Sequence, residues 1–193
     1  MTMKRGVIKI KYAVIREMDI SNGEGIGIAL FVQGCHFHCY NCFNEATWDF
    51  DGGKEWTESV KIDFLSLADE PYIKRISILG GEPLAQENLD GILDLIKSIN
   101  KIYGDAKKIW LYTGYTYEQL ISNRMEEIKL STGVDKIYET VNNVDILVDG
   151  LYIDKLRDIT LKWRGSSNQR VIDVQSTLRN EIITLYNGND KHI

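Results

Sequence analysis

The stretch "IGIALFVQGCHFHCYNC" (residues 26–42) joins an apolar run to a loop that holds all three cysteines of the chain. Its first part reads as a buried β-strand, because a short continuous apolar run ending at a glycine is typical of a strand covered on both faces. Its second part, from Cys35 to Cys42, also contains two of the three histidines. The expected strand therefore leads directly into a cluster of side chains that commonly bind metals.

The rest of the chain alternates between strand-like and helix-like patterns. We expect further strands at residues 7–15, 75–80, 108–114 and 144–150. We expect helices from about residue 58, after a threonine cap, over residues 87–103, where apolar side chains recur at helical spacing, and over residues 117–128. This alternation predicts an α/β fold with a mainly parallel sheet. A length of 193 residues without repeats or linkers predicts one domain.

Four of the expected strands end in turns that contain glycine. These turns lie at Gly34, at Gly80 and Gly81, at Gly114 and at Gly150. Parallel α/β sheets place their active sites at the carboxyl ends of their strands. We therefore expect the four turns to converge on one site, together with the cysteine loop that follows the first of them.

The charge of the chain argues against a nucleic-acid partner. Its formal net charge is −5 at pH 7, and its Lys and Arg residues are scattered rather than grouped into a basic groove. The N-terminal residues alternate between apolar and charged types, and no apolar stretch approaches the roughly 20 residues of a membrane span. We expect a cytoplasmic protein with no membrane partner, whose reduced cysteines bind metal or do redox chemistry.

The cysteines have the spacing C-x3-C-x2-C, which permits three interpretations. One is a structural zinc site with His36 or His38 as fourth ligand, although the usual second pair of ligands is missing. Another is a catalytic cysteine, which does not need two further thiols at fixed spacing. The third is a [4Fe–4S] cluster held by three thiolates, which leaves one iron open to a substrate or cofactor. The spacing by itself leaves all three open.

The spacing closely resembles the signature of radical S-adenosylmethionine (SAM) enzymes. "GGEP" (residues 80–83) looks like the glycine-rich motif of that family, which binds the amino group of SAM. Further blocks resemble, in the same order, the activating proteins of anaerobic ribonucleoside-triphosphate reductase. These blocks are residues 22–50, "WLYTGY" (110–115), "VDILVDG" (144–150) and "WRGSSNQRVID" (163–173). The "RGSSNQR" part is the most specific, because radical SAM enzymes in general do not need it.

This resemblance implies a fold, a reaction and partners. The fold would be a partial, open (β/α) barrel of the radical SAM type, with residues 1–193 as a single domain whose core spans about 22–173. The cofactors would be one [4Fe–4S] cluster and SAM. An electron from a donor such as flavodoxin or ferredoxin would cleave SAM, and the 5′-deoxyadenosyl radical would generate a glycyl radical on the reductase large subunit. The alternatives are an activase of another glycyl-radical enzyme, of the pyruvate formate-lyase type, and a non-enzymatic zinc-binding module.

The resemblance also implies roles for individual residues. The cluster ligands would be Cys35, Cys39 and Cys42, and no catalytic side chain beyond the cluster and SAM is implied. Residues at the cofactor would be Asn41, Phe43, Gly80, Gly81 and Glu82, the last three holding the SAM ammonium. Further contacts with SAM or the reductase would come from Tyr112, Thr113, Asp149, Arg164, Ser166, Asn168 and Arg170. For this last group, packing or turn formation stays open as an alternative, and either arginine suits the SAM carboxylate.

Several features depart from the family pattern. Many members have an aromatic residue before the third cysteine, whereas this chain has Asn41 there and Tyr40 one place earlier. Relatives commonly have arginine where this chain has Gly27, so any role of that side chain is missing or moved. Residues 124–143 and the tail after residue 173 match none of the blocks. We expect the two histidines of the loop to shape it rather than to bind iron.

Overall fold

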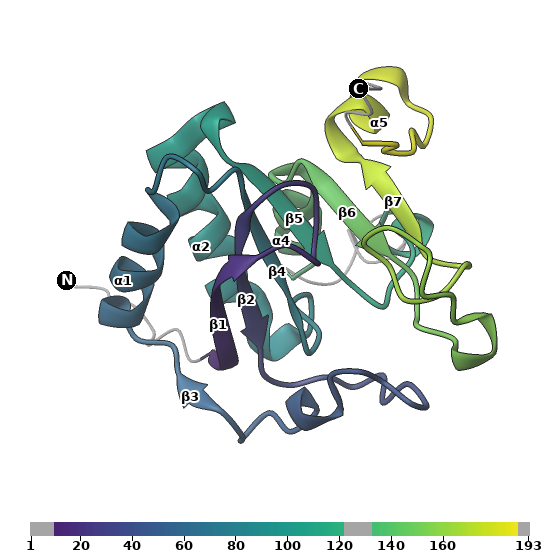
Figure 1. The fold of residues 1–193 in the computed structure, drawn as a ribbon, viewed down its shortest axis with the longest axis horizontal. Helices are drawn as coiled ribbons and strands as arrows, with labels where there is room; N and C mark the ends of the chain where they lie inside the picture. Colours follow the sequence, from purple (N-terminus) through teal and green to yellow (C-terminus); the bar gives the residue numbers. More distant parts are fainter. Residues whose placement is uncertain (1–9, 122–132, 189–193) are drawn as a thin grey trace.

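Seven strands form one open sheet in the computed structural model, which describes residues 10–121 and 133–188 (Figure 1). Their order across the sheet is β3-β1-β2-β4-β5-β6-β7. The strands are β1 (Lys11–Asp19), β2 (Gly27–Val32), β3 (Lys54–Glu55), β4 (Arg75–Gly80), β5 (Lys108–Tyr112), β6 (Ile146–Asp149) and β7 (Arg170–Asp173). Neighbours among β2, β4, β5 and β6 are parallel, whereas β1, β3 and β7 pair antiparallel. The predicted α/β fold with a mainly parallel core sheet is confirmed.

Helices connect the parallel strands, largely where the sequence predicts them. The described α-helices are α1 (Glu58–Ala68), α2 (Gln86–Tyr103), α4 (Gly133–Asn142) and α5 (Val174–Asn180). α1 begins at the predicted cap, where the Thr57 hydroxyl accepts a hydrogen bond from the backbone N–H of Val60 at 3.3 Å. Residues 117–121 are helical as predicted, and the rest of that predicted helix lies outside the described residues. None of the helices that the structure describes has the length and apolar character to cross a membrane.

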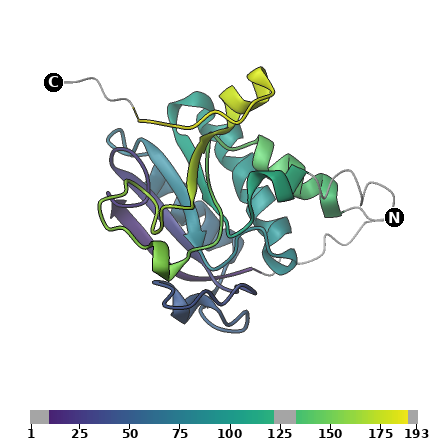
Figure 2. The same ribbon diagram turned by 90° about the vertical axis from the view of Figure 1, so that its right-hand side faces the viewer.

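The two faces of the sheet are covered differently. Alternate residues such as Ile28, Ile76, Ile109 and Leu147 pack into the main core, under the helices. The residues between them point to the other side, which we call the helix-free face; they include Phe31, Leu79, Trp110, Tyr112 and Val148. Figure 2 shows the helices on one side of the strands and the loop between β6 and β7 on the other. The parallel strands are therefore apolar on both faces, which explains their continuous apolar runs.

The first strand is displaced from its predicted position. The alternation over residues 7–15 predicts a strand there, whereas β1 runs from Lys11 to Asp19 and residues 7–9 lie outside the described range. The strand extends further because it pairs antiparallel with β2 as far as the pair Asp19 and Gly27. Pairing with a neighbouring strand therefore extends this element beyond its local pattern at the C-terminal end.

Among the described strands and α-helices, four have no counterpart in the sequence prediction: β3, β7, α4 and α5. β7 falls within the "RGSSNQRVID" block and closes the sheet beyond β6. The backbone N–H of Asp173 donates to Thr184 O at 2.9 Å, and that of Tyr186 donates to Val171 O at 2.8 Å. Part of the unmatched tail therefore returns along β7 and satisfies the backbone groups of this edge strand.

Candidate functional site

The glycine turns predicted at the strand ends meet at the carboxyl ends of the parallel strands. The backbone N–H of Glu82 donates to Gly34 O at 2.7 Å, and the N–H of Gly150 donates to Tyr115 O at 2.9 Å. A Cβ atom at Gly81 would lie 2.2 Å from Gly34 O, so only glycine permits this close approach of the two turns. The turns after β2, β4, β5 and β6 therefore form one continuous surface.

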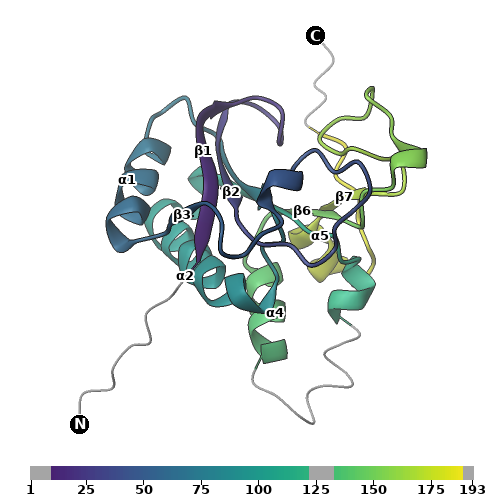
Figure 3. The same ribbon diagram turned by 90° about the horizontal axis from the view of Figure 1, so that it is seen from below.

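All three cysteines line a cleft against this surface. The cleft has a volume of about 140 Å³, and Gly80, Gly81, Gly114 and Gly150 line its other side. We call it the cysteine cleft. Figure 3 shows the cysteine loop, in dark blue, crossing in front of the strands when the molecule is viewed from below. In the part of the chain that the structure describes, no three His, Cys, Asp or Glu side chains are grouped as a site for a metal ion.

The cysteine loop is held in shape by its backbone and by ring contacts. His38 and Asn41 have positive φ angles of 46° and 55°, which lets the chain turn tightly between the thiols. The His36 ring lies 4.4 Å from the Phe50 ring, with its Nε2 atom 3.1 Å from a Glu87 carboxylate oxygen. The His38 ring stacks on Trp48. These contacts agree with the expectation that the histidines shape the loop.

The donor set of the cysteine cleft fits an iron–sulfur cluster. Burial raises the pKa of the Cys35 thiol, and hydrogen bonds from the backbone N–H groups of Phe37 and His38 oppose this shift. Burial also raises the pKa of the Cys39 thiol. The backbone N–H of Asn44 lies 3.4 Å from Cys42 Sγ. Amide donors near the sulfurs stabilise thiolates and are one of the means by which proteins tune cluster potentials.

Glu82 of the "GGEP" motif is almost fully buried at the base of the cysteine cleft. One oxygen of its carboxylate accepts hydrogen bonds from Leu84 N at 2.8 Å and the Thr113 hydroxyl at 2.9 Å. The other accepts from Gly114 N at 2.8 Å. Burial raises the pKa of Glu82 to about 7, against these hydrogen bonds. The side chain therefore ties the end of β4 to the end of β5, a role that its motif does not reveal.

Tyr112 lies between the cysteine cleft and a neighbouring cleft of about 460 Å³ on the helix-free face. Its hydroxyl is buried and has no hydrogen-bond partner among the described residues. Burial raises the pKa of this hydroxyl far above its usual value. Cys42, Asn44 and Tyr152 line both clefts, so the two form one continuous space in front of the thiols.

Asp149 and Arg170, both predicted as contacts with SAM or the reductase, bind each other in this structure. Asp149 is 1% exposed, and it accepts hydrogen bonds from Arg170 Nε at 3.0 Å and from the backbone N–H of Tyr117 at 2.7 Å. Arg170 also donates to both carboxylate oxygens of Glu118, at 2.8 and 2.6 Å. These bonds to Arg170 lower the pKa of Glu118 to about 2. The three side chains brace β6, β7 and the helix that begins at residue 117.

The remaining "RGSSNQR" residues divide into two groups. Ser166 is fully buried and accepts a hydrogen bond from Ile153 N at 3.2 Å, while Asn168 Nδ2 donates to Leu151 O at 2.8 Å. Both therefore hold the preceding loop. Arg164 instead lines the neighbouring cleft with Cys42 and Phe43, and its buried Nε has no partner among the described residues. Of the two arginines, Arg164 is the one that faces the clefts.

Gly27 stands where relatives commonly have an arginine, and a side chain from the neighbouring strand fills the space beside it. Gly27 pairs with Arg75 on the neighbouring strand, and a Cβ atom at Gly27 would lie 2.4 Å from Arg75 Cγ. Arg75 is 1% exposed and donates to Asp19 Oδ1 at 2.7 Å and to Ser77 Oγ at 2.6 Å. An arginine thus reaches this space from β4 instead of β2. The signal for this in the sequence is Arg75, a charged residue at the start of an apolar strand.

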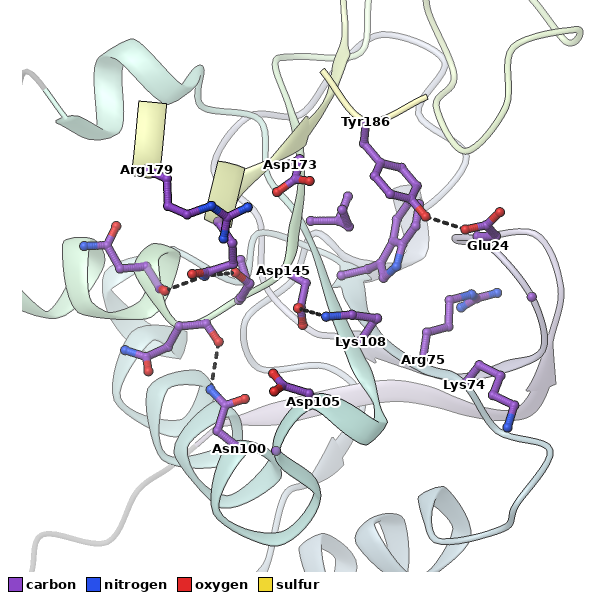
Figure 4. A pocket seen from close by; sticks show the side chains of 18 residues that line it. Glu24, Lys74, Arg75, Asn100, Asp105, Lys108, Asp145, Asp173, Arg179 and Tyr186 are labelled. Carbon is purple, nitrogen blue, oxygen red and sulfur yellow. Dashed lines mark hydrogen bonds and ion pairs between the residues drawn. The ribbon is translucent and has the colours of Figure 1, made fainter. Parts of the chain in front are cut away.

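A larger cleft, of about 750 Å³, lies at the opposite ends of the parallel strands (Figure 4). It is lined by Lys74, Lys108 and Asp145, which precede or begin β4, β5 and β6. Lys108 Nζ lies 2.7 Å from Asp145 Oδ1, so part of its charge is paired internally. No cysteine lines this cleft. The three thiols lie instead at the carboxyl ends, where parallel sheets place their active sites.

Comparison with known proteins shows where the chain belongs. A family model described as a 4Fe-4S single cluster domain matches residues 21–172. An anaerobic ribonucleoside-triphosphate reductase-activating protein of Escherichia coli K12 is 35% identical over 156 residues, which cover 80% of this chain and 92% of the relative. The chain belongs to this family of activating proteins. Its resemblance to the family, predicted from the sequence, is confirmed.

Other relatives carry the same name. The activating protein of Salmonella typhi is 34% identical over 164 residues, covering 84% of this chain and 97% of the relative. That of bacteriophage T4 is 32% identical over 162 residues, covering 84% and 93%. The membership in an activating family with a 4Fe-4S domain confirms the predicted enzyme class and favours an iron–sulfur cluster over zinc.

Proposed function

We propose that this activating protein holds one [4Fe–4S] cluster through Cys35, Cys39 and Cys42, binds SAM beside it and generates a glycyl radical on an anaerobic ribonucleoside-triphosphate reductase. One observation supports this most strongly: the only three thiols of the chain line a cleft formed by glycine turns at the carboxyl ends of parallel strands. Three thiolates leave one position of a cubane cluster open. When bound, the cluster supplies the electron that cleaves SAM, and the 5′-deoxyadenosyl radical removes a hydrogen atom from the reductase glycine.

The proposal includes the fold type and the domain organisation. The helices cover one face of an open sheet and the clefts lie on or beside the other, as in a partial (β/α) barrel of the radical SAM type. Residues 1–193 form one domain in this proposal, with the core at about 22–173. The family match over residues 21–172 supports these core limits.

Residues around the cysteine cleft would hold SAM. The backbone carbonyls of Gly80 and Gly81 are suited to accept hydrogen bonds from its ammonium, because glycine permits close approach. Glu82 contributes its negative charge and orients Thr113 through their 2.9 Å hydrogen bond. Asn41 and Phe43 flank the last cysteine and would lie against the cofactors.

The neighbouring cleft would take the rest of SAM. Tyr112, whose hydroxyl has no hydrogen-bond partner within residues 10–121 and 133–188, lies beside the space for the adenosine, and Arg164 suits the carboxylate. Arg170 and Asp149 brace the site, because they are already bonded to each other. Ser166 and Asn168 act on the cofactor indirectly, through the loop that they hold.

The proposed partners are the reductase large subunit and a one-electron donor such as flavodoxin or ferredoxin. Such partners place the protein in the cytoplasm. The names of the relatives support the reductase as the target, and three cysteines grouped as a ligand loop agree with a reducing compartment.

Loading with iron and sulfide under anaerobic conditions tests the ligand set. Wild type is expected to take up four irons per chain, with cluster absorbance and an electron paramagnetic resonance signal after reduction. Cys39→Ala should lose the intact cluster and yield no glycyl radical. Tyr40→Ala is the matched control, since Tyr40 is 78% exposed in the same loop and has no thiol. A colourless wild type that holds zinc, or a normal radical yield from Cys39→Ala, would contradict the proposal.

The choice of target needs a separate measurement. Wild type with SAM and a reductant is mixed in turn with the anaerobic reductase and with an enzyme of the pyruvate formate-lyase type. A glycyl-radical signal is expected with the reductase. A signal that arises only with the other enzyme would replace the proposed target.

A further inference from the structure

The loop between β6 and β7 forms a defined projection beside the cysteine cleft. We call residues 151–165 the lobe; in Figures 1 and 2 it is the green segment that extends from the sheet on the side away from α1, α2 and α4. The turn η3 (Asp154–Leu156) lies within it. Backbone hydrogen bonds from Ser167 N to Leu156 O, at 2.9 Å, and from Asp158 N to Gly165 O, at 3.3 Å, join its outgoing and returning parts. The lobe therefore has a fixed shape although it adds no strand to the sheet.

The lobe exposes apolar side chains that the core does not use. Leu151, Ile153 and Leu156 are 40%, 42% and 42% exposed, and Ile159 is 85% exposed. Single exposed apolar residues are common on protein surfaces, but several on one short projection are a feature of interaction sites. The exposed parts of these side chains add no apolar burial to the fold, and a partner that covers them would remove that area from water.

These apolar residues are continuous with the cysteine cleft. Phe43, next to Cys42, is 71% exposed, and its ring lies 5.9 Å from the ring of Tyr152, a residue of both the lobe and the cleft. The Arg157 guanidinium lies 5.2 Å from the Phe43 ring. At the other end, a Cβ atom at Gly114 would contact both Leu151 and Phe37. A partner that covers the lobe would therefore also reach the mouth of the cleft.

The charge of the lobe differs from that of the whole chain. Outside the clefts the lobe has three cations, Lys155, Arg157 and Lys162, and two carboxylates, whereas the complete chain has a net charge of −5. The two carboxylates accept hydrogen bonds within the lobe: Asp154 from the Tyr152 hydroxyl at 2.9 Å, and Asp158 from the Thr160 hydroxyl at 2.6 Å. The lobe is thus a cationic projection from an acidic protein, complementary to an apolar surface edged by carboxylates.

We propose that the lobe is the docking surface for the glycine-bearing region of the reductase, which contacts it through an apolar surface flanked by acidic side chains. This inference rests on the proposed function, because a reductase glycine must reach the cysteine cleft. The apolar residues hold the partner, and the cations speed its approach, since exposed charges act mainly on association rates. Two residues of the "RGSSNQR" block contribute indirectly, because Ser166 and Asn168 form hydrogen bonds that hold the lobe in place.

The test separates docking from SAM chemistry in the cluster-loaded protein. Ile159→Asp places a charge on the most exposed apolar residue of the lobe, and Ile159 lines neither cleft. We expect reductive SAM cleavage without the reductase to stay within about twofold of wild type, because the cofactor site is unchanged. Binding to the reductase, measured by surface plasmon resonance under anaerobic conditions, should weaken at least about tenfold, with a matching loss of glycyl radical. Ile182→Asp is the control, because Ile182 is 72% exposed outside the lobe.

The contribution of the lobe's cations to the association rate is measured with Lys155→Glu. This variant should slow association with the reductase about threefold or more at low salt, with little effect at high salt, where exposed charges are screened. Reductase binding by Ile159→Asp that equals wild type would overturn the inference. A change in the self-association of the chain, with reductase binding intact, would do the same by assigning the lobe to a second copy. Failure of wild type to cleave SAM would count against the proposed function instead.

Discussion

Glu82 follows β4 and Asp149 ends β6, and both are buried carboxylates that tie one strand end to its neighbour. Their partners differ. Glu82 accepts hydrogen bonds from two backbone N–H groups and a hydroxyl, all uncharged, while Asp149 is paired with the Arg170 guanidinium. Burial therefore raises the pKa of Glu82 to about 7. Neutral donors only partly offset the loss of water around a charge, whereas a guanidinium adds an opposite charge as well.

The difference places the two carboxylates in different roles. Glu82 lines the cysteine cleft and combines a structural task with an electrostatic one, since its charge state can respond to a bound ammonium. Asp149 is enclosed by Arg170 and the N–H of Tyr117, and does not line that cleft. The comparison indicates that the β4 end is adapted to a ligand and the β6 end to rigidity. Three predictions test it, in order of decreasing effect.

The largest effect is expected from breaking the buried ion pair. Asp149→Asn keeps the shape of the side chain but removes the charge opposite Arg170. We expect a loss of about 3 kcal/mol in the free energy of unfolding, because the buried side chain loses the charge that strengthens its hydrogen bonds from Arg170 and Tyr117, while Glu118 still pairs with Arg170. Urea unfolding of the cluster-free chain measures it, since a bound cofactor would complicate two-state analysis. A loss below about 1 kcal/mol would show that Glu118 alone balances Arg170.

The second effect concerns the pH dependence of Glu82. Its folded pKa, about 7, lies above the ordinary value of 4.5, so the protonated form is favoured in the fold. This contribution is fully present below about pH 4.5 and is lost as the pH rises through 7, which amounts to about 2.5 kcal/mol between pH 5 and pH 8. The free energy of unfolding of wild type should therefore fall, relative to Glu82→Gln, between pH 5 and pH 8. Parallel pH profiles of the two proteins would contradict the assigned environment.

The smallest effect is expected from Glu118, the exposed partner of Arg170. Glu118 is largely exposed and binds Arg170 from outside, opposite buried Asp149. Glu118→Gln should lower the free energy of unfolding by less than about 1 kcal/mol near neutral pH, because exposed ion pairs contribute little. Denaturant unfolding at low and high salt measures it, and Asp149→Asn serves as the comparison. Equal losses from both variants would show that burial does not distinguish the two carboxylates.

The sequence predicts those features of this protein that are encoded by residues close together in the chain. The cap at Thr57, the apolar periodicity of α2 and the glycine turns after the parallel strands each predict structure found there. The cysteine spacing predicts a ligand loop for the same reason, because its residues are close in sequence. The confirmed membership in an activating family depends on several such blocks in a fixed order.

Other features depend on contacts between distant residues. β7 is short and polar at its start, so no local pattern distinguishes it from a turn; it is a strand because it pairs with β6. Arg170 and Asp149 are each reasonable cofactor ligands when taken alone, and only their pairing shows that they bind each other. Arg75 occupies the space beside Gly27 because the two lie opposite each other in neighbouring strands.

The sequence alone therefore determined the family, the thiol loop and the alternation of strands and helices, since each is encoded by residues that are neighbours in the chain. Tertiary structure decided which polar side chains face the clefts and which face one another, and that the lobe between β6 and β7 presents Ile159 to solvent. The physical reason is that a buried charge must find a partner, and the partner is chosen by the folded arrangement rather than by sequence distance.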